Sequence, residues 1–319
     1  MRSALVAILL LVSLCAHATT AYPDKPIRLI VPVAPGRGAD ITARAVAQKL
    51  AAAWGQQIII DNRAGAGGTV GMEIGARATP DGYTLIEGSM GPLTVDMSLY
   101  SKLPYDSVRD FTPIARGVTA LNMLVVHPSL PVNNVRELIA YLKANPNKVA
   151  VATSGRGSNP QLWALAFMQA TGTQMIDVPY KGSGAAHPDL LSGQTQVMFD
   201  AVASVAPHVK AGKLKILAVG AEKRSPYLPD VPTMQEAGVP GYAMASWGAV
   251  IVPAKTPKPI VDFLYREIAA VLSEPDVKER MAGMLAEVIA NPPAEAARLM
   301  NADEARLTKL IRDVGLPPE

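Results

Sequence analysis

Apolar positions along the chain fall into two kinds of run. Short, almost wholly apolar runs predict buried strands, and longer runs with apolar residues at helical spacing predict helices. The first part of the chain predicts, in order, strand 27–33, helix 41–54, strand 57–61, a helix after Gly68 and strand 83–87. A second series predicts helix 135–144, strand 148–153, helix 160–171 and strands 175–179, 195–200 and 214–219. This alternation is typical of an α/β protein built on mostly parallel sheets flanked by helices.

Two long apolar stretches, 111–127 and 242–253, lie outside these series. Each is long enough to leave one compact unit and enter another, so we predict two lobes joined by two crossings. Lobe 1 is then discontinuous, with residues 22–120 plus 246–319, and lobe 2 comprises residues 121–245. A chain of 319 residues is long enough for each lobe to bury its own core.

The last part of lobe 1 predicts helices. Thr256 is predicted as an N-cap, with Pro257 in the first turn. One apolar stripe follows and is expected to pack in the core: Ile260, Phe263, Leu264, Ile268, Val271 and Leu272.

Residues 1–21 have the pattern of a secretory signal peptide. They contain one positive charge, Arg2, and an apolar run over 4–14 that is too short to span a bilayer. Cys15 follows a bulky leucine, which disfavours a lipoprotein cleavage site. We therefore expect cleavage after Ala21 or Ala18 and a periplasmic location.

The composition of the chain excludes several classes of function. The single cysteine lies in the predicted leader, which excludes disulfides, thiol catalysis and cysteine metal sites in the mature chain. The formal charge is +3 and falls to +2 without Arg2. Because there is also no basic run, the sequence gives no support for a nucleic acid partner. We expect a soluble monomer, since no later apolar run reaches bilayer length.

Two segments, 31–40 and 149–159, repeat one pattern: an apolar strand, Gly-Arg-Gly, and the start of a helix. Backbone N–H groups in such a turn and at a helix N-terminus bind carboxylates and phosphates. The repeat predicts two anion-binding loops that share one ligand, whereas glycines that only permit tight turns are the alternative. The predicted ligand-binding residues are Ala34, Pro35, Gly36, Arg37, Gly38 and Asp40 in the first loop and Ser154, Gly155, Arg156, Gly157, Ser158 and Asn159 in the second.

Arg37 and Arg156 stand in the middle of these loops. A guanidinium there can pair with a ligand carboxylate through two hydrogen bonds, and the alternative is a solvated arginine that points outward. Asp40 and Asn159 are predicted as the N-caps of the two helices, with Pro160 in the first turn of the second.

Motifs of enzymes are incomplete in this chain. The first loop has Ile41 where a dinucleotide fingerprint requires its third glycine. No serine lies in Gly-x-Ser-x-Gly, and His127, His187 and His208 have no metal-binding spacing. We predict no cofactor, no metal and a binding protein, and a secreted enzyme that acts on small carboxylic acids is the alternative.

A series of short blocks runs in order along the mature chain. With them the chain resembles the solute-binding receptors of tripartite tricarboxylate transporters, the Bug family. The blocks are 22–23, 26–32, 61–68, 80–85, 103–106, 178–182, 198–200, 211–214 and 228–233.

The resemblance implies a two-lobed periplasmic binding fold, type II-like, that closes over its ligand in the manner of a Venus flytrap. It implies that the strand-to-helix loops and ordered water hold a carboxylate. Compared with the usual receptor, Arg37 replaces a glycine, Ala39 a threonine or serine, Arg156 an asparagine and Gln161 a nearby histidine. The resemblance also implies contacts from Ser89, Met90, Asp200, Ala201 and Trp247.

Two added arginines favour a dicarboxylate or aromatic acid over an amino acid, because a ligand ammonium group would repel them. We therefore predict a receptor that captures a small organic acid between its lobes. The partner is expected to be a two-component membrane permease, or a membrane sensor kinase. The sequence leaves uptake and sensing as alternatives.

Overall fold

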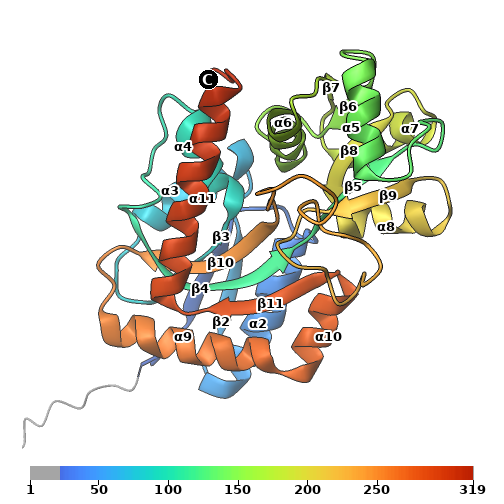
Figure 1. Ribbon diagram of the computed structural model, residues 1–319. Helices are drawn as coiled ribbons and strands as arrows, with labels where there is room; N and C mark the ends of the chain where they lie inside the picture. Colours follow the sequence, from blue (N-terminus) through green and yellow to red (C-terminus); the bar gives the residue numbers. More distant parts are fainter. Residues whose placement is uncertain (1–21, 319) are drawn as a thin grey trace, which may run out of the picture.

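The computed structural model describes residues 22–318 (Figure 1). The predicted signal peptide, residues 1–21, lies outside the described residues. Across 22–318, no helix is both long and apolar enough to cross a membrane.

A six-stranded sheet combines strands from both ends of the chain, in the order β11-β4-β10-β3-β1-β2. β1 pairs in parallel with β2 and β3, and the pairs of β10 with β3 and of β4 with β10 and β11 are antiparallel. Its strands are β1 (Ile27–Val31), β2 (Ile58–Asn62), β3 (Thr84–Ser89), β4 (Phe111–Ala120), β10 (Ser246–Pro253) and β11 (Ala286–Asn291).

A five-stranded sheet is made from the middle of the chain, in the order β7-β6-β8-β5-β9. β6 is parallel to β7 and β8, whereas β5 is antiparallel to β8 and β9. The predicted α/β class is confirmed, but both sheets are mixed and not mostly parallel as predicted. The strands are β5 (Asn122–Val126), β6 (Ala150–Thr153), β7 (Ile176–Pro179), β8 (Val197–Ala201) and β9 (Lys215–Val219).

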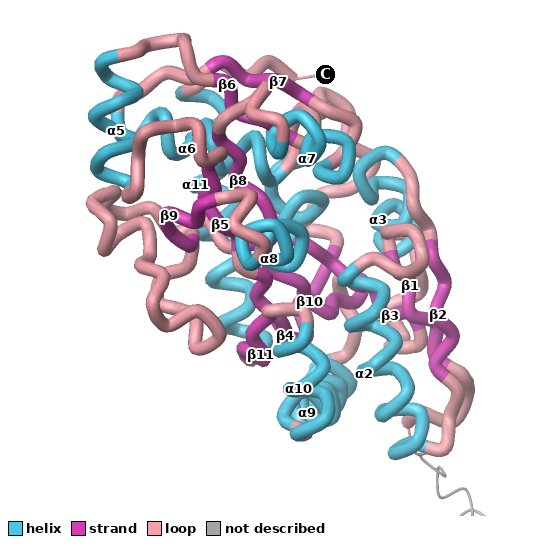
Figure 2. Tube along the Cα trace, turned by 90° about the vertical axis from the view of Figure 1, so that its right-hand side faces the viewer, coloured by secondary structure: helices cyan, strands magenta, loops and turns pink. Residues whose placement is uncertain are grey.

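Helices cover both faces of the six-stranded sheet because successive strand residues point to opposite sides. Leu29 and Leu85 pack with α2 (Gly38–Trp54) and α9 (Lys258–Ser273), whereas Ile30 and Ile86 belong to the cluster that contains α3 (Thr69–Ala76) and α11 (Pro293–Asp313). Figure 2 shows α2 alongside α9 and α10 (Pro275–Gly283). Three short elements complete this half: η1 (Ala66–Gly68), η2 (Gly91–Val95) and α4 (Asp96–Leu99).

The five-stranded sheet is covered in the same way. Leu124 and Phe199 pack in the cluster that contains α5 (Val135–Ala144) and α6 (Asn159–Thr171). Met123 and Met198 pack with α7 (Ser183–Leu191) and α8 (Val202–Lys210) on the other face. The cluster around α6 also contains side chains of α11, so one apolar core continues between the two sheets.

The chain segments that connect the two sheets are bonded to one another. β4 and β5 are separated only by Leu121, and the fully buried Asn122 follows. The Asn122 side chain donates to the carbonyl of Met244, just before β10. The Gly220 amide donates to the Asn122 carbonyl (3.1 Å), and the Met244 amide donates to the Gly220 carbonyl (2.8 Å).

Three predicted N-caps are wrong. α2 begins at Gly38 with Arg37 as N-cap, so Asp40 lies in its first turn. α6 begins at Asn159, and the Ser158 hydroxyl caps it by accepting from the Gln161 amide. Thr256 instead donates to the Pro253 carbonyl (2.7 Å), and α9 has Pro257 as its N-cap. In each case the residue at the N-cap position is a near neighbour of the predicted one: Arg37, Ser158 or Pro257.

Candidate functional site

The first Gly-Arg-Gly loop leads from the carboxyl end of β1 into α2 and is open to solvent. Ala34, Pro35, Gly36, Arg37 and Gly38 are all exposed. No side chain caps α2, and its first internal bond runs from the Ile41 amide to the Arg37 carbonyl (2.9 Å). The N–H groups of the first turn therefore have no acceptor within the helix, which is the geometry that binds an anion.

The buried carboxylate of Asp40 fixes the conformation of this loop. This carboxylate is 2% exposed and accepts hydrogen bonds from the Gly36 amide (2.8 Å), Arg44 Nε (3.0 Å) and Asn62 Nδ2 (2.9 Å). Burial alone would raise the pKa of Asp40, but the hydrogen bonds from Arg44, Gly36 and Asn62 lower it to about 2. Asp40 therefore stays ionised and holds the Gly36 end of the loop in place.

The second Gly-Arg-Gly loop, between β6 and α6, binds its own groups. Gln161 accepts from the Gly157 amide through Oε1 (2.7 Å) and donates to Asp177 through Nε2 (2.6 Å). Thr153 donates to the other oxygen of Asp177 (2.7 Å). The two loops therefore share a sequence pattern but differ in their free N–H groups. The Gly157 amide of the second loop already has an acceptor, whereas no side chain caps the first turn of α2.

The two loop arginines also differ. Arg37 is exposed at the start of α2. Arg156 donates from Nη2 to the backbone carbonyl of Pro317, beyond α11. The second loop is thereby attached to the C-terminal segment of the described chain.

One segment, η2 followed by α4, contacts the supports of both loops. A Cβ on Gly68 would lie 2.9 Å from Pro92 Cγ and 3.4 Å from Cβ of Pro32, which precedes the first loop. A Cβ on Gly157 in the second loop would overlap Leu99 Cδ1 of α4. Both glycines have positive φ (+114° and +68°), so larger residues are excluded by conformation and by space. Residues 91–99 therefore pack directly against the second loop at Gly157 and, through Gly68, lie near Pro32 at the start of the first loop.

The contacts implied by the resemblance lie in different environments. Ser89 is half-buried at the carboxyl end of β3, whereas the Met90 side chain is in the core. Asp200 is 3% exposed and accepts from Ser183 Oγ (2.9 Å), and Ala201 is the N-cap of α8, which has no side-chain cap. Asp200 also contacts His187 Nε2 (2.9 Å). Because the aspartate bridges serine and histidine, this is not the order of a hydrolytic triad, in which histidine is the bridge.

Trp247 lies on the face of the six-stranded sheet that α11 covers. Its indole is 2% exposed and donates to Asp303 Oδ2 of α11 (2.8 Å), and the Arg116 guanidinium lies 5.1 Å from the indole centroid. The indole of Trp247 is therefore bound to Asp303 and Arg116 within the protein.

Two buried acids were missed by the sequence analysis. Glu87 of β3 is 8% exposed, and burial raises its pKa to about 8. Burial also raises the pKa of Asp96 to about 6, and its Oδ2 atom is buried without a hydrogen-bond partner. The signal for Glu87 was available, since an acidic residue interrupts the apolar run of β3. Within residues 22–318, no group of three or more histidine, cysteine or acidic side chains is placed to hold a metal ion.

Two α/β sheets, bonded crossings between them and an uncapped helix N-terminus at the carboxyl end of a strand define the class of two-lobed solute-binding proteins. The family model described as the tripartite tricarboxylate transporter family receptor matches residues 42–316. The chain belongs to this family, whose members are solute-binding receptors and not enzymes. The resemblance found in the sequence is thereby confirmed.

Relatives agree along nearly the whole chain. Protein BugT of Bordetella pertussis is 35% identical over 295 residues, 92% of this chain and 90% of that protein. The structure of R. palustris Rpa4515 with adipate has a TM-score of 0.80 and 35% identity, covering 93% of this chain and 100% of the other. MatC from Rhodopseudomonas palustris with bound malate has a TM-score of 0.75 and 32% identity, covering 91% and 100%.

Proposed function

We propose that this protein captures a small dicarboxylate between two lobes, residues 22–120 plus 246–319 and residues 121–245. The observation that carries the proposal is the uncapped first turn of α2 beside the exposed Arg37. One ligand carboxylate accepts hydrogen bonds from the amides of Gly38 and Ala39, and the Arg37 guanidinium pairs with it. Charge-assisted bonds of this kind contribute roughly 1.5–3 kcal/mol each.

The other end of the ligand lies against the second lobe. Ser154, Gly155 and Ser158 are half-buried in the loop after β6 and supply hydroxyl and backbone groups there. Arg156 acts through the loop rather than on the ligand, because its guanidinium is bonded to Pro317. Ala201 and the uncapped start of α8 add a second set of amides on the same lobe.

The ligand class follows from charge and from the relatives. Arg37 adds a cation to an anion site, which favours acids without an ammonium group. The two related structures described above hold adipate and malate, which are both dicarboxylates. Lobe closure then selects the bound state by surrounding the ligand.

The family indicates where the protein works in the cell and which partner it serves. We infer that a leader over residues 1–21 exports it to the periplasm, where it works as a monomer. It then delivers the acid to a membrane permease, in keeping with a family of transporter receptors.

The proposal is tested with two glycine variants of matched chemistry. Gly38 and Gly283 both have ordinary φ, and no atom lies within 4 Å of the place that a Cβ would take, so each accepts aspartate without strain. Gly38→Asp places a negative charge at the start of α2 and is expected to lower the affinity for malate or adipate at least about 100-fold. Gly283→Asp makes the same charge change in α10 and is expected to leave the affinity unchanged.

Calorimetric titration of the wild type and both variants measures this effect. Butanoate and hexanoate serve as monocarboxylate controls for the dicarboxylates. Equal affinity of Gly38→Asp and Gly283→Asp for the dicarboxylate would exclude the α2 site. Monocarboxylates that bind as tightly as dicarboxylates would exclude the two-headed ligand.

A further inference from the structure

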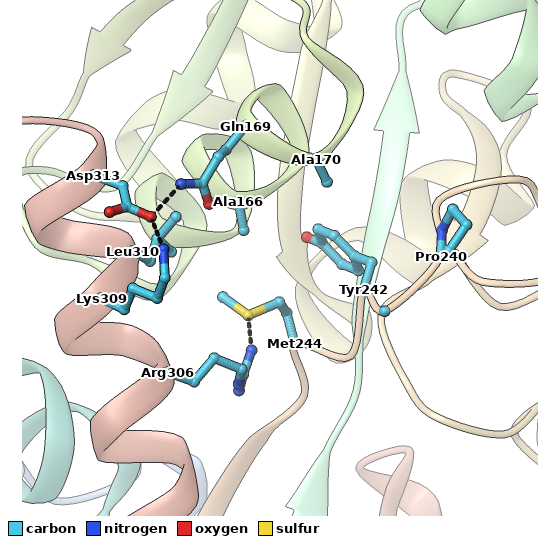
Figure 3. A pocket seen from close by; sticks show the side chains of 11 residues that line it. Ala166, Gln169, Ala170, Pro240, Tyr242, Met244, Arg306, Lys309, Leu310 and Asp313 are labelled. Atoms are coloured by element: carbon cyan, nitrogen blue, oxygen red, sulfur yellow. Dashed lines mark hydrogen bonds and ion pairs between the residues drawn. The ribbon is translucent and has the colours of Figure 1, made fainter.

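A pocket of about 290 Å³ lies between α6, the segment before β10, and α11 (Figure 3). α6 packs on β6 and β8 of the five-stranded sheet, and α11 packs on β4 of the six-stranded sheet. The walls of the pocket therefore come from elements of both sheets. None of the residues of the two Gly-Arg-Gly loops lines it.

The floor of the pocket is apolar. Ala166, Ala170 and Leu310 border it from the two helices, and Tyr242 and Met244 border it from the segment before β10. The Tyr242 hydroxyl is already used, since it donates to the Trp163 carbonyl (3.0 Å). Tyr242 therefore presents its ring to the pocket, as Figure 3 shows, and this floor suits a ligand with a hydrocarbon body.

One edge of the pocket carries an incompletely satisfied cation. Arg306 donates from Nη2 to Asp303 Oδ1 (2.8 Å), but the acceptor for Nη1 is the thioether sulfur of Met244. A thioether is a weak acceptor, so a carboxylate oxygen at the same place would make a stronger bond. The Arg306 side chain is 39% exposed, which leaves the guanidinium accessible to a ligand.

Lys309, the other cation of the pocket, has oxygen acceptors only from its own helix. Lys309 donates to Asp313 Oδ2 (2.5 Å), and Gln169 donates to the same oxygen (2.9 Å). This group lies at the upper edge of Figure 3, and Arg306 differs from it in having Nη1 directed at a thioether instead of an oxygen acceptor. The pocket thus offers one incompletely satisfied cation above an apolar floor, with room for a molecule at the small end of the usual ligand range of about 300–1,000 Å³.

We propose that this pocket is a second ligand site, which binds a small amphipathic monocarboxylate with its carboxylate on Arg306 and its apolar body against Ala166, Ala170 and Met244. The site shares no lining residue with the dicarboxylate site proposed above. Because its walls come from helices of both sheets, an occupant stabilises this arrangement of the sheets. Binding in the pocket is therefore expected to change dicarboxylate affinity at the loops, and the two effects must be reciprocal.

Methyl NMR tests the site directly. In protein labelled with 13C at the methionine methyl groups, the Met244 signal is assigned with Met244→Leu. Benzoate is the probe, and we expect a saturable shift of the Met244 signal. Ala170→Phe fills the pocket from an exposed position, and Arg306→Met removes the cation, so each is expected to weaken benzoate binding at least 10-fold.

Two controls separate this site from the loops. Arg312→Met removes an exposed charge from the same helix, outside the pocket, and is expected to leave benzoate binding unchanged. Gly38→Asp is expected to keep the Met244 response while it loses dicarboxylate binding. An unchanged Met244 signal at saturating benzoate, or undiminished binding to the folded Ala170→Phe variant, would overturn the second site. Loss of the response in Gly38→Asp would assign benzoate to the loops and overturn it as well.

Discussion

Arg156 donates a hydrogen bond to the backbone carbonyl of Pro317, 161 residues further along the chain. This bond connects the loop after β6, which belongs to the five-stranded sheet, to the end of α11, which packs on the six-stranded sheet. The second Gly-Arg-Gly loop is therefore held by a contact between the two halves of the molecule, whereas the first loop is held by Asp40 of its own helix.

The two loop arginines should respond oppositely to truncation. Arg156→Ala is expected to lower the free energy of unfolding by about 1 kcal/mol, since it removes the exposed bond to Pro317. Arg37→Ala is expected to leave stability unchanged and to weaken malate binding about 10-fold or more. Urea denaturation and calorimetric titration of both variants measure these effects. A larger loss of malate affinity in Arg156→Ala than in Arg37→Ala would contradict the roles assigned to them.

Asp40 should make stability depend on acidic pH. Its pKa is lowered from 3.8 to about 2 in the folded protein, so its contribution is present above the unfolded pKa and disappears as the pH falls through the folded pKa. Asp40→Asn is expected to cost about 2 kcal/mol at pH 7 and nothing near pH 2. Denaturant titrations at several pH values provide the measurement.

The matched control for Asp40 is Asp262→Asn. Asp262 pairs with Lys258 at the same helical spacing, but its side chain is 49% exposed. Its replacement is expected to change stability by less than about 0.5 kcal/mol at either pH. An equal loss in both variants would show that the buried hydrogen bonds of Asp40 add nothing.

Glu87 should act in the opposite direction. Burial raises its pKa from 4.5 to about 8, so its favourable contribution is complete below the unfolded pKa and is lost as the pH rises toward 8. Glu87→Gln carries no charge and is expected to be more stable than the wild type at pH 8, by an amount on the order of a few kcal/mol, and similar to it at pH 4. The exposed Glu279 gives the control, because Glu279→Gln should follow the wild-type curve throughout. A wild-type stability that rises between pH 5 and 8 relative to Glu87→Gln would refute the buried neutral acid.

Gln161 should control the exposure of the second loop. Gln161→Leu leaves the Gly157 amide and Asp177 without their present partner, and we expect a loss of about 1–3 kcal/mol in stability. Amide hydrogen exchange at Gly157 is expected to become faster. Gln169→Leu, which removes an exposed hydrogen bond from the same helix, should change stability by less than about 0.5 kcal/mol and leave exchange at Gly157 unchanged. Unaltered exchange at Gly157 in Gln161→Leu would contradict this arrangement.

Apolar periodicity was sufficient to predict most elements of the fold. Helix 135–144 was predicted with the bounds that the structure has, Val135–Ala144, because its apolar stripe is the buried face. The stripe of α9 was also confirmed, with Leu264, Ile268, Val271 and Leu272 buried. Which face of a helix is buried depends on the spacing of its own apolar residues, so this spacing predicts the buried residues well.

The failures at the two loops depend partly on partners that are remote in the sequence. The carboxylate of Asp40 turns away from the capping position because Asn62, on β2, and Arg44 donate to it. The direction of Arg156 depends on Pro317. No spacing rule contains such pairs, which is why the sequence predicted two equivalent loops where the structure has one open and one internally bonded loop.

The order of the strands has a consequence for how the protein assembles. All five strands of the central sheet are contained within residues 122–219, whereas the other sheet places β10 between β3 and β4 and so is incomplete until residues 246–253 have been made. Contacts between such distant segments form slowly. In a nascent chain of this protein the edge of β3 therefore has no partner until β10 has been made, which prolongs its exposure to aggregation.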